Sequence, residues 1–483
     1  MYADIIIKNG LIVDGDGTPG RNADLAIKDE LIVALGDLTN WQASTMIDAA
    51  GKVVSPGFID PHVHHDEAVL TDPLLTCMTS QGVTTVINGN CGFSIAPLKH
   101  QGRLPAPLDL ILDADRPRFS SYAQYRQALE ADPPAVNAAC LIGHGSLRIN
   151  EVADLSRPAD ASELKRMQQA LDQALSQGGL GVSTGPFYPP ARAATTAELT
   201  AMAQIAQAHG KLYATHMRDE GDHVVDALNE TFQVGRDAHC GVHVSHHKCA
   251  GLANHGMSAI TLPMIEKAMK AQDVGLDTTP WTASATMLNS GRHKQATRVI
   301  VSDSERYPEM AGRDLADIAA QWGVSLDQAV ERLIPAAGIF FIMDEKDVQR
   351  ILSFEHTIIC SDGIHKGSHP HPRVWGTFPR VLGHYRRDVK LFTLEQAIRR
   401  MTSMPADRFG IGRRGRLAVD HFADVVVFDP DTIAERATFQ KPVQPAAGIE
   451  HVFVNGRLVW DGQKATGARP GKHLDKTAPT QVV

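Results

Sequence analysis

Six side chains of the kinds that bind metals lie at the ends of apolar runs in this 483-residue chain. Each follows a stretch typical of a buried strand, and the six are His62, His64, Cys91, His216, His246 and Asp362. In a parallel barrel the C-terminal ends of all strands meet at one face, so residues remote in sequence can converge there. Imidazole, thiolate and carboxylate groups are ligands that zinc takes in proteins. The pattern therefore predicts a divalent zinc site.

Each of these residues has a simpler explanation when it is taken alone. A His-x-His pair places both rings on one side of a strand, but such pairs also occur by chance. A lone buried cysteine is more often a small hydrophobic residue, although the glycines in Asn88-Gly89-Asn90-Cys91-Gly92 allow a sharp turn and a close approach. His216 and His246 could be core histidines, and Asp362 could be a turn residue. Their arrival together at successive strand ends favours the metal site.

The elements that must position these residues alternate along the middle of the chain. From about residue 55 to residue 410, apolar strand-like runs alternate with amphipathic helical stretches. This alternation predicts an α/β fold with a parallel sheet, closed into a (β/α)8 TIM-type barrel. Short β-branched runs with tight turns, in the first 50 residues and again near the end, predict an antiparallel sheet. We expect a barrel over 55–410 and a small β-sandwich domain formed by 1–54 and 411–483.

Composition excludes several classes of function. The chain is 43% hydrophobic and 21% charged, a balance that supports a large buried core. Its net charge of -8, with no polybasic run, argues against nucleic acid as a partner. The N-terminus lacks a signal-type pattern and no 18-residue apolar run occurs, so we predict a cytoplasmic protein without a membrane partner. A small-molecule substrate remains, bound by a monomer or a small homo-oligomer.

Longer motifs around these residues resemble known families. Pro56-Gly57-Phe58-Ile59-Asp60-Pro61-His62-Val63-His64 resembles the first-strand signature of the amidohydrolase superfamily, and the flanking β segments are similar to its small β-sandwich domain. Further motifs resemble the D-aminoacylase (N-acyl-D-amino-acid deacylase) family, among them Asn88-Gly89-Asn90-Cys91-Gly92, Ala214-Thr215-His216-Met217-Arg218-Asp219-Glu220-Gly221, Ser245-His246-His247-Lys248, Ser361-Asp362-Gly363 and His369-Pro370-His371-Pro372-Arg373-Val374-Trp375-Gly376. The likeness extends over nearly the whole chain.

The resemblance implies zinc-dependent hydrolysis of the amide bond of N-acyl-D-amino acids. A tightly held zinc ion would be bound by Cys91, His216 and His246, and a second, weaker position would be marked by His62, His64 and Asp362. Strand parity does not choose between His246 and its neighbour His247, but the family pattern favours His246. Zinc would polarise the amide carbonyl and acidify a water molecule. Asp362 would take the proton from that water and give it to the leaving amine.

The resemblance also implies how the substrate is held. Arg373 would pair bidentately with the α-carboxylate, a geometry that suits guanidinium, and Lys248 and Tyr188 would assist. One departure from the family concerns the group that holds the carbonyl oxygen of the substrate, which becomes an oxyanion during the reaction. Relatives use the first tyrosine of a Tyr-Pro-Tyr motif for this, and this chain has Thr279 at that position. Stabilisation of that charge must then come from zinc, from Thr279 through water, or from another group. A second departure is the basic loop Ile364-His365-Lys366-Gly367-Ser368.

The segment from about residue 285 to residue 345 is longer than an ordinary connection, which predicts a lid over the barrel mouth. Basic residues gather in it, at Arg292, His293, Lys294 and Arg298. Candidates for an apolar wall of the substrate-binding site are Phe187, Phe340 and Met343. Basic loops are usually solvated. If Lys294 instead points inward, as its match to a specificity position of the family implies, an acidic D-side chain is favoured over leucine or methionine.

Two other functions remain open at this point. Another C–N hydrolase of the same superfamily would act on a cyclic amide or a dipeptide, and the altered position Thr279 leaves room for it. A non-catalytic barrel scaffold is the third interpretation. Retention of all six metal-ligand candidates argues against a scaffold.

Overall fold

The computed structural model describes residues 1–113, 115–116 and 118–476, and within them eight parallel strand positions close into a ring. Three positions are interrupted by short breaks. In ring order they are β6 (Phe58–Asp60) with β7 (Val63–His64), β8 (Val83–Asn88), β9 (Asn137–Cys140) with β10 (Ile142–Gly143), β11 (Gly181–Thr184), β12 (Leu212–Thr215), β13 (Val242–Val244), β14 (Val274–Thr278), and β18 (Thr357–Ile359) with β19 (Gly363–Ile364). Pairing of β19 with β7 closes the ring. The predicted (β/α)8 class is confirmed.

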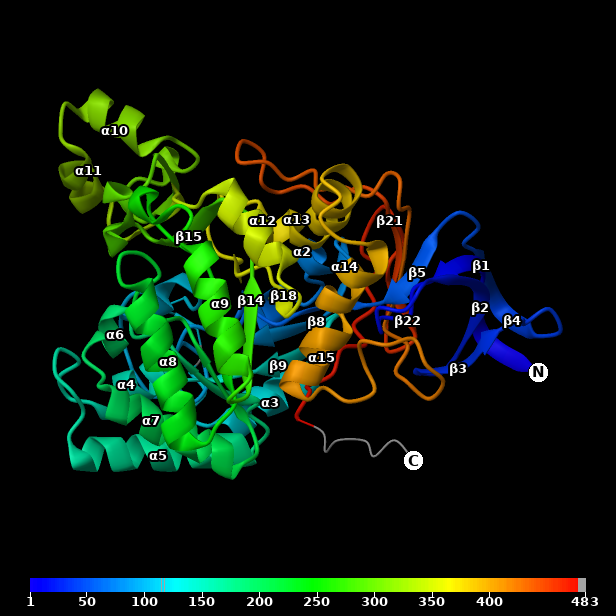
Figure 1. Ribbon diagram of the computed structural model, residues 1–483, viewed down its shortest axis with the longest axis horizontal. Coiled ribbons are helices and arrows are strands. Elements are labelled where there is room, and N and C mark those ends of the chain that lie inside the picture. Colours follow the sequence, from blue (N-terminus) through cyan, green and yellow to red (C-terminus); the bar gives the residue numbers. More distant parts are fainter. Residues whose placement is uncertain (114, 117, 477–483) are drawn as a thin grey trace.

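Helices cover the outside of this barrel (Figure 1). The longer ones are α3 (Tyr122–Ala131), α4 (His144–Glu151), α5 (Ala161–Ser176), α7 (Thr196–Ala208), α8 (Val224–Ala238), α9 (Ser258–Met269), α12 (Glu345–Ser353), α13 (Arg373–Arg380) and α14 (Leu394–Met401). Shorter ones are α1 (Ala68–Thr71), α2 (Thr76–Thr79), α6 (Pro189–Arg192) and α15 (Ser403–Phe409). All residues of β8 and β14 are buried, as expected for strands covered by helices.

Strands from both ends of the chain form one sheet beside the barrel (Figure 1). Its order is β22-β21-β20-β5-β1-β2-β3, with β4 paired to β1. The bounds are β1 (Tyr2–Ile12), β2 (Arg21–Lys28), β3 (Leu31–Gly36), β4 (Gln42–Asp48), β5 (Val53–Pro56), β20 (Val425–Phe428), β21 (Ile449–Val454) and β22 (Arg457–Trp460). Ile7, Leu25, Val54, Val427 and Phe453 belong to one apolar core. The expected sheet of both termini is confirmed, while the bounds 1–54 and 411–483 stay a prediction, and 477–483 lie outside the described residues.

The long segment between β14 and β18 folds outside the ring, since these two strands pair directly. It contains a three-stranded antiparallel sheet in the order β15-β17-β16, and α10 and α11 lie between β16 and β17. The bounds are β15 (Ala283–Met287), β16 (Arg298–Ser304), β17 (Ala336–Phe341), α10 (Leu315–Trp322) and α11 (Leu326–Leu333). Figure 1 shows α10 and α11 projecting from one corner of the molecule. A lid function of this segment stays a prediction.

Among the described residues, every helix is too short or too polar to cross a bilayer.

Candidate metal centre

All six predicted ligands lie at the C-terminal ends of barrel strands. His62 and His64 come from the first strand position, and Cys91 follows β8. His216 follows β12, His246 follows β13, and Asp362 lies in the break between β18 and β19. All six side chains are buried. The fold therefore brings together residues that are up to 300 positions apart, as 362 minus 62 gives.

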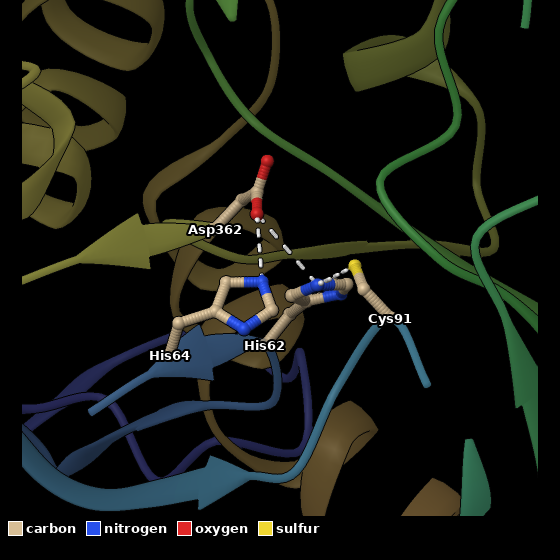
Figure 2. A group of neighbouring side chains, drawn as sticks. All are labelled: His62, His64, Cys91 and Asp362. Carbon is tan, nitrogen blue, oxygen red and sulfur yellow. Dashed lines mark hydrogen bonds and ion pairs between the residues drawn. The ribbon is translucent and has the colours of Figure 1, made fainter. Parts of the chain in front are cut away.

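The Cys91 thiol lies between two groups of ligand atoms. Its Sγ is 3.2 Å from His62 Nε2 and 3.2 Å from His246 Nε2. Asp362 Oδ1 is 3.5 Å from His64 Nε2 and 3.7 Å from His62 Nε2. Figure 2 draws both contacts as dashed lines. The atoms of His62, His64, Cys91 and Asp362 lie within 4.8 Å of one another, and those of Cys91, His216 and His246 do too. This geometry can hold one cation, or two that share the thiolate.

Three of these residues adopt an unfavourable backbone conformation. Cys91, His246 and Asp362 have φ values of 54°, 35° and 52°, in the left-handed region that side chains rarely enter. The turn before Cys91 also needs glycine, because a Cβ at Gly89 would lie 1.9 Å from a backbone oxygen of Leu141. Strain of this kind persists only where the surroundings enforce it, and it is concentrated at functional sites.

The choice between the two neighbouring histidines after β13 is visible in their contacts. His246 Nε2 is directed at the Cys91 thiol. His247 Nε2 is 2.9 Å from Thr261 Oγ1, on α9. The positive φ of His246 breaks the alternation of side chains along the strand. Counting odd and even positions along β13 therefore could not choose between His246 and His247.

Charges within the cluster reinforce one another. Burial alone would raise the pKa of the Cys91 thiol, but the imidazoles of His62 and His246 outweigh it and hold that pKa well below its usual value. Burial would likewise raise the pKa of Asp362, whereas the Arg373 guanidinium and His246 keep it well below the ordinary range. Burial opposes protonation of His64, yet Asp362 and Cys91 raise its pKa to about 9. Thiolate and carboxylate are therefore the forms of Cys91 and Asp362 at neutral pH.

His216 supplies the observation that points to a missing partner. Both of its ring nitrogens are buried, and neither has a hydrogen-bond partner among the described residues. Its ring packs against Phe187 and Tyr188, with centroids 5.2 and 4.8 Å away, and against His246 at 4.5 Å. An unpaired buried polar group costs about 1–3 kcal/mol. The donor set of imidazoles, thiolate and carboxylate suits a zinc ion, which would satisfy these atoms.

Two buried carboxylates that the sequence interpretation did not single out support the ligands from behind. Glu220 Oε1 is 2.9 Å from His246 Nδ1, and Glu220 Oε2 is 3.4 Å from His216 Nε2. Asp277 Oδ2 is 3.6 Å from His62 Nδ1 and 2.9 Å from His243 Nε2. Carboxylates in this position orient metal-binding imidazoles. Glu220 lies four residues after His216, within the motif 214–221. This short separation was the feature of the sequence that could have indicated its role.

The predicted substrate-binding residues Arg373 and Lys248 are buried beside the cluster. Arg373 Nη1 is 2.8 Å from Asp362 Oδ2, and its Nε has no hydrogen-bond partner among the described residues. Lys248 Nζ donates to Glu220 Oε1 at 2.5 Å and lies 2.8 Å from His246 Nδ1. Both cations thus pair with protein groups in this structure.

The other predicted wall residues divide between the site and its surroundings. Tyr188 and Phe187 contact His216, as described above. Met343 and Thr279 line a small cavity together with Lys248. Phe340 is buried in β17 and packs near Gly338, inside the long inserted segment.

The basic residues of the segment 292–298 divide between buried and exposed positions. Lys294 does not point inward, because its side chain is 64% exposed and Nζ pairs with Asp327 at 3.2 Å. Arg292 is the buried cation of the loop. Its Nη2 is 2.6 Å from Glu220 Oε2 and its guanidinium lies 4.9 Å from the centre of the Phe187 ring. The turn Arg292–Lys294 is a 3₁₀ helix, in which neighbouring side chains point in different directions.

Comparison with known proteins agrees with this geometry. The amidohydrolase family model matches residues 45–460. A D-aminoacylase of Alcaligenes xylosoxydans xylosoxydans is 50% identical over 475 residues, which cover 98% of both chains. A solved D-aminoacylase structure, described with a binuclear metal center showing one-metal activation and second-metal attenuation, has a TM-score of 0.96 at 50% identity and covers 98% of this chain and 100% of that one.

A second solved structure is the N-acyl-D-glutamate deacylase from Bordetella bronchiseptica, complexed with zinc and a phosphonate inhibitor that mimics the tetrahedral intermediate of the reaction. It has a TM-score of 0.95 at 42% identity and covers 98% of this chain and 100% of that one. These matches span both the barrel and the sheet of the two termini. The chain belongs to the D-aminoacylase (N-acyl-D-amino-acid deacylase) family of the amidohydrolase superfamily.

Proposed function

We propose that this chain hydrolyses the amide bond of N-acyl-D-amino acids and releases a carboxylate and a free D-amino acid. The observation that carries the proposal is the buried Cys91 thiol between two groups of ligands, with its Sγ 3.2 Å from both His62 and His246. The 50% identity to a D-aminoacylase over 98% of the chain supports the reaction type.

Zinc is the proposed cofactor. Cys91, His216 and His246 would hold one ion tightly, while His62, His64 and Asp362 would form a weaker position. The ring nitrogens of His216, which form no hydrogen bond among the described residues, support this assignment, as do the zinc and the binuclear center of the two solved relatives. A bound zinc ion supplies a Lewis acid that polarises the amide carbonyl and acidifies a water molecule.

Asp362 is the proposed proton carrier. Its carboxylate is ionised near neutral pH, since the pKa lies well below the ordinary range, so it can accept a proton from the attacking water. The same side chain can then deliver that proton to the leaving nitrogen. Arg373, with a buried Nε that lacks a partner among the described residues, would bind the substrate α-carboxylate, assisted by Lys248 and Tyr188.

The deciding experiment is a turnover screen of zinc-loaded protein against N-acetyl-D- and N-acetyl-L-amino acids. We expect turnover of D-forms only. Activity restricted to L-forms would refute the proposed substrate class. Hydantoins and dipeptides belong in the same screen, because turnover of these alone would favour the cyclic-amide or dipeptide hydrolase. Stoichiometric zinc that is lost in Cys91→Ser protein would exclude the non-catalytic scaffold.

A preference for acidic D-side chains is the finer part of the proposal, and Arg292 is the residue that we assign to it in place of Lys294. Its side chain is 8% exposed, and Nε and Nη1 have no hydrogen-bond partner among the described residues. Glu220 offsets part of its charge at 2.6 Å, but the guanidinium retains free donors. A carboxylate could accept from them in charge-assisted hydrogen bonds, which are worth about 1.5–3 kcal/mol.

Two matched variants test this assignment. Arg292→Leu should lower the ratio of kcat/KM for N-acetyl-D-glutamate over N-acetyl-D-leucine by about 10- to 100-fold, following from that energy. Lys294→Leu should leave the ratio within about threefold, since an exposed charge contributes little. The reverse outcome would return the specificity role to Lys294. Location in the cytoplasm and a monomer or small homo-oligomer remain part of the proposal.

A further inference from the structure

A second cluster of metal-binding side chains lies next to the barrel mouth and shares no residue with the Cys91 groups. It consists of His65, Cys77 and His365. His65 directly follows β7, Cys77 lies in α2, and His365 directly follows β19. One ligand atom from each lies within 4.8 Å of the other two. Nothing in the proposed deacylase chemistry uses these residues.

The spacing of the cluster agrees with a tetrahedral cation. Cys77 Sγ is 3.6 Å from His365 Nδ1. Bond lengths of about 2.3 Å to sulfur and about 2.0–2.1 Å to nitrogen, at a tetrahedral angle, place two zinc ligands about 3.6 Å apart. The other ring nitrogen of His365, Nε2, lies 3.5 Å from Asp72 Oδ2. A carboxylate behind a ligand imidazole is the arrangement that fixes its ring orientation in metal sites.

His65 provides an independent observation. Its side chain is fully buried, and within the described part of the chain neither ring nitrogen has a hydrogen-bond partner. Its Nε2 faces the backbone of β19, where a Cβ at Gly363 would lie only 3.3 Å from it. A buried imidazole with both nitrogens unpaired is unfavourable unless something else satisfies it. A cation bound between His65, Cys77 and His365 would do so.

We propose that His65, Cys77 and His365 bind a transition-metal cation of the zinc class, with water in the fourth position. Two imidazoles and a thiolate are a ligand set that zinc prefers. The His365 side chain is 32% exposed and that of Asp72 is 45% exposed, so a cation can enter from solvent.

The location of this site predicts what the cation does. β7 and β19 close the barrel through two residue pairs, Val63 with Gly363 and His64 with Ile364. His65 and His365 are the next residues on these two strands. A cation that binds both residues would join the strand ends that carry His64 and Asp362. It is therefore a structural clamp on the closing pair of strands.

Cobalt absorption distinguishes this site from the proposed catalytic one. A thiolate bound to Co²⁺ gives an intense near-ultraviolet charge-transfer band, and serine gives none. In Cys91→Ser protein titrated with Co²⁺, we expect such a band to remain, because Cys77 supplies a second thiolate. Adding Cys77→Ser should abolish it. Adding Cys240→Ser instead should leave it intact, since the thiol of Cys240 lies 3.5 Å from the backbone oxygens of Lys211 and Gly241 and belongs to none of the groups of potential metal ligands among the described residues.

A second variant guards against misfolding of the Cys77→Ser protein. His365→Ala removes a partly exposed side chain. In the Cys91→Ser background it should lower the Co²⁺ affinity, measured by titration of the charge-transfer band, by more than about 10-fold. Zinc should also raise the Tm of Cys91→Ser protein by an increment that Cys77→Ser removes. Absence of a thiolate band in Cys91→Ser, or its survival in the double variant, would overturn the proposal. Absorption and Tm do not depend on deacylase activity, so this test is separate from that of the proposed function.

Discussion

Two buried clusters of imidazole, carboxylate and guanidinium groups behave differently in this molecule. Around Glu198, on α7, the carboxylate and the guanidinium satisfy one another, and only one ring nitrogen of His144, Nδ1, lacks a hydrogen bond among the described residues. Glu198 Oε1 is 2.8 Å from His144 Nε2 and also accepts from Arg148. The remaining donors of Arg148 reach backbone oxygens of Pro190 at 2.7 Å and Arg157 at 2.8 Å. Around Cys91, by contrast, both ring nitrogens of His216 lack a hydrogen bond among the described residues, and Nε2 has only an ion-pair contact with Glu220 at 3.4 Å.

The difference separates a cluster that stabilises the fold from one that a ligand completes. His144 and Glu198 lie in regular helices, whereas Cys91, His246 and Asp362 have positive φ. Strained backbone and unpaired buried nitrogens both cost free energy, of the order of 1–3 kcal/mol for each group. The first cluster should therefore govern stability, and the second should govern metal binding and turnover.

Cys91→Ser should produce the largest effect on turnover. Without the thiolate, the ligand cluster loses its anionic sulfur and should bind zinc more weakly. A bound metal ion stabilises the charge of the transition state by several kcal/mol, and this stabilisation should be lost with the ion. We expect kcat/KM to fall by at least about 10³-fold and the zinc content to fall as well. The metal-free variant should be as stable as the metal-free wild-type protein. Cys240→Ser, a buried cysteine away from the mouth, should retain activity. Comparable activity of the Cys91 and Cys240 variants would erase the distinction between the two clusters.

Asp362→Asn should lower kcat by about 10²- to 10⁴-fold, the range for loss of a general acid and base. Because Asp362 is not among the residues assigned to the tight ion, that ion should remain, and the zinc content should exceed that of Cys91→Ser protein. Elemental analysis and steady-state kinetics on the same sample check both expectations. A fully active variant would remove Asp362 from the mechanism.

Arg148→Met should affect stability instead. It leaves Glu198 buried with His144 and the backbone N–H of Ala159 but without its cation, and loss of one partner of a buried pair typically costs about 3–5 kcal/mol. Urea unfolding would measure that loss, while kcat of the folded protein should stay nearly unchanged. The control is Arg126→Met, whose exposed pair with Glu130 should contribute less than about 1 kcal/mol. Equal losses from both variants would contradict a stabilising role of the Glu198 cluster.

Glu220→Gln should have an intermediate effect on the metal site. Glu220 contacts the ligand imidazoles of His216 and His246, and loss of such an orienting partner typically lowers metal affinity by 10- to 100-fold. Competition with a zinc chelator measures the change. An unaltered affinity would mean that Glu220 only neutralises Lys248 and Arg292.

Acid stability should show the smallest effect. Burial alone would raise the pKa of Glu198, but the hydrogen bond from His144 and the Arg148 guanidinium lower it from 4.5 to about 2. The stabilisation from this carboxylate is therefore complete above about pH 4.5 and is lost as the pH falls toward 2. Glu198→Gln should flatten this part of the curve of unfolding free energy against pH. A wild-type curve that is already flat there would contradict the pKa shift.

The sequence predicted the barrel and the six ligand candidates because both follow from periodicity. Apolar runs mark strands, and the residue after each run lies at the strand end, where a barrel gathers its polar groups. Loops carry no such period. The inward position of Arg292 rather than Lys294 depends on a three-residue 3₁₀ turn, which no pattern in the sequence marks.

The choice of ligand after β13 was also beyond the residue pattern. His246 takes a φ of 35°, so its side chain leaves the alternation on which parity arguments depend. The resemblance to a family selected it, and the 3.2 Å contact with Cys91 agrees. The role of Glu220 was not predicted, because it depends on tertiary contacts with His216 and Lys248 that the residue pattern does not show.

The central claim is that the Cys91 thiolate, His216 and His246 hold a zinc ion. Anomalous diffraction from crystals of the zinc-loaded protein, collected on both sides of the zinc absorption edge, tests it most directly. We predict a peak about 2.3 Å from Cys91 Sγ and about 2.0–2.1 Å from one nitrogen each of His216 and His246. A fully zinc-loaded, active crystal with no peak within bonding distance of that sulfur would contradict the account.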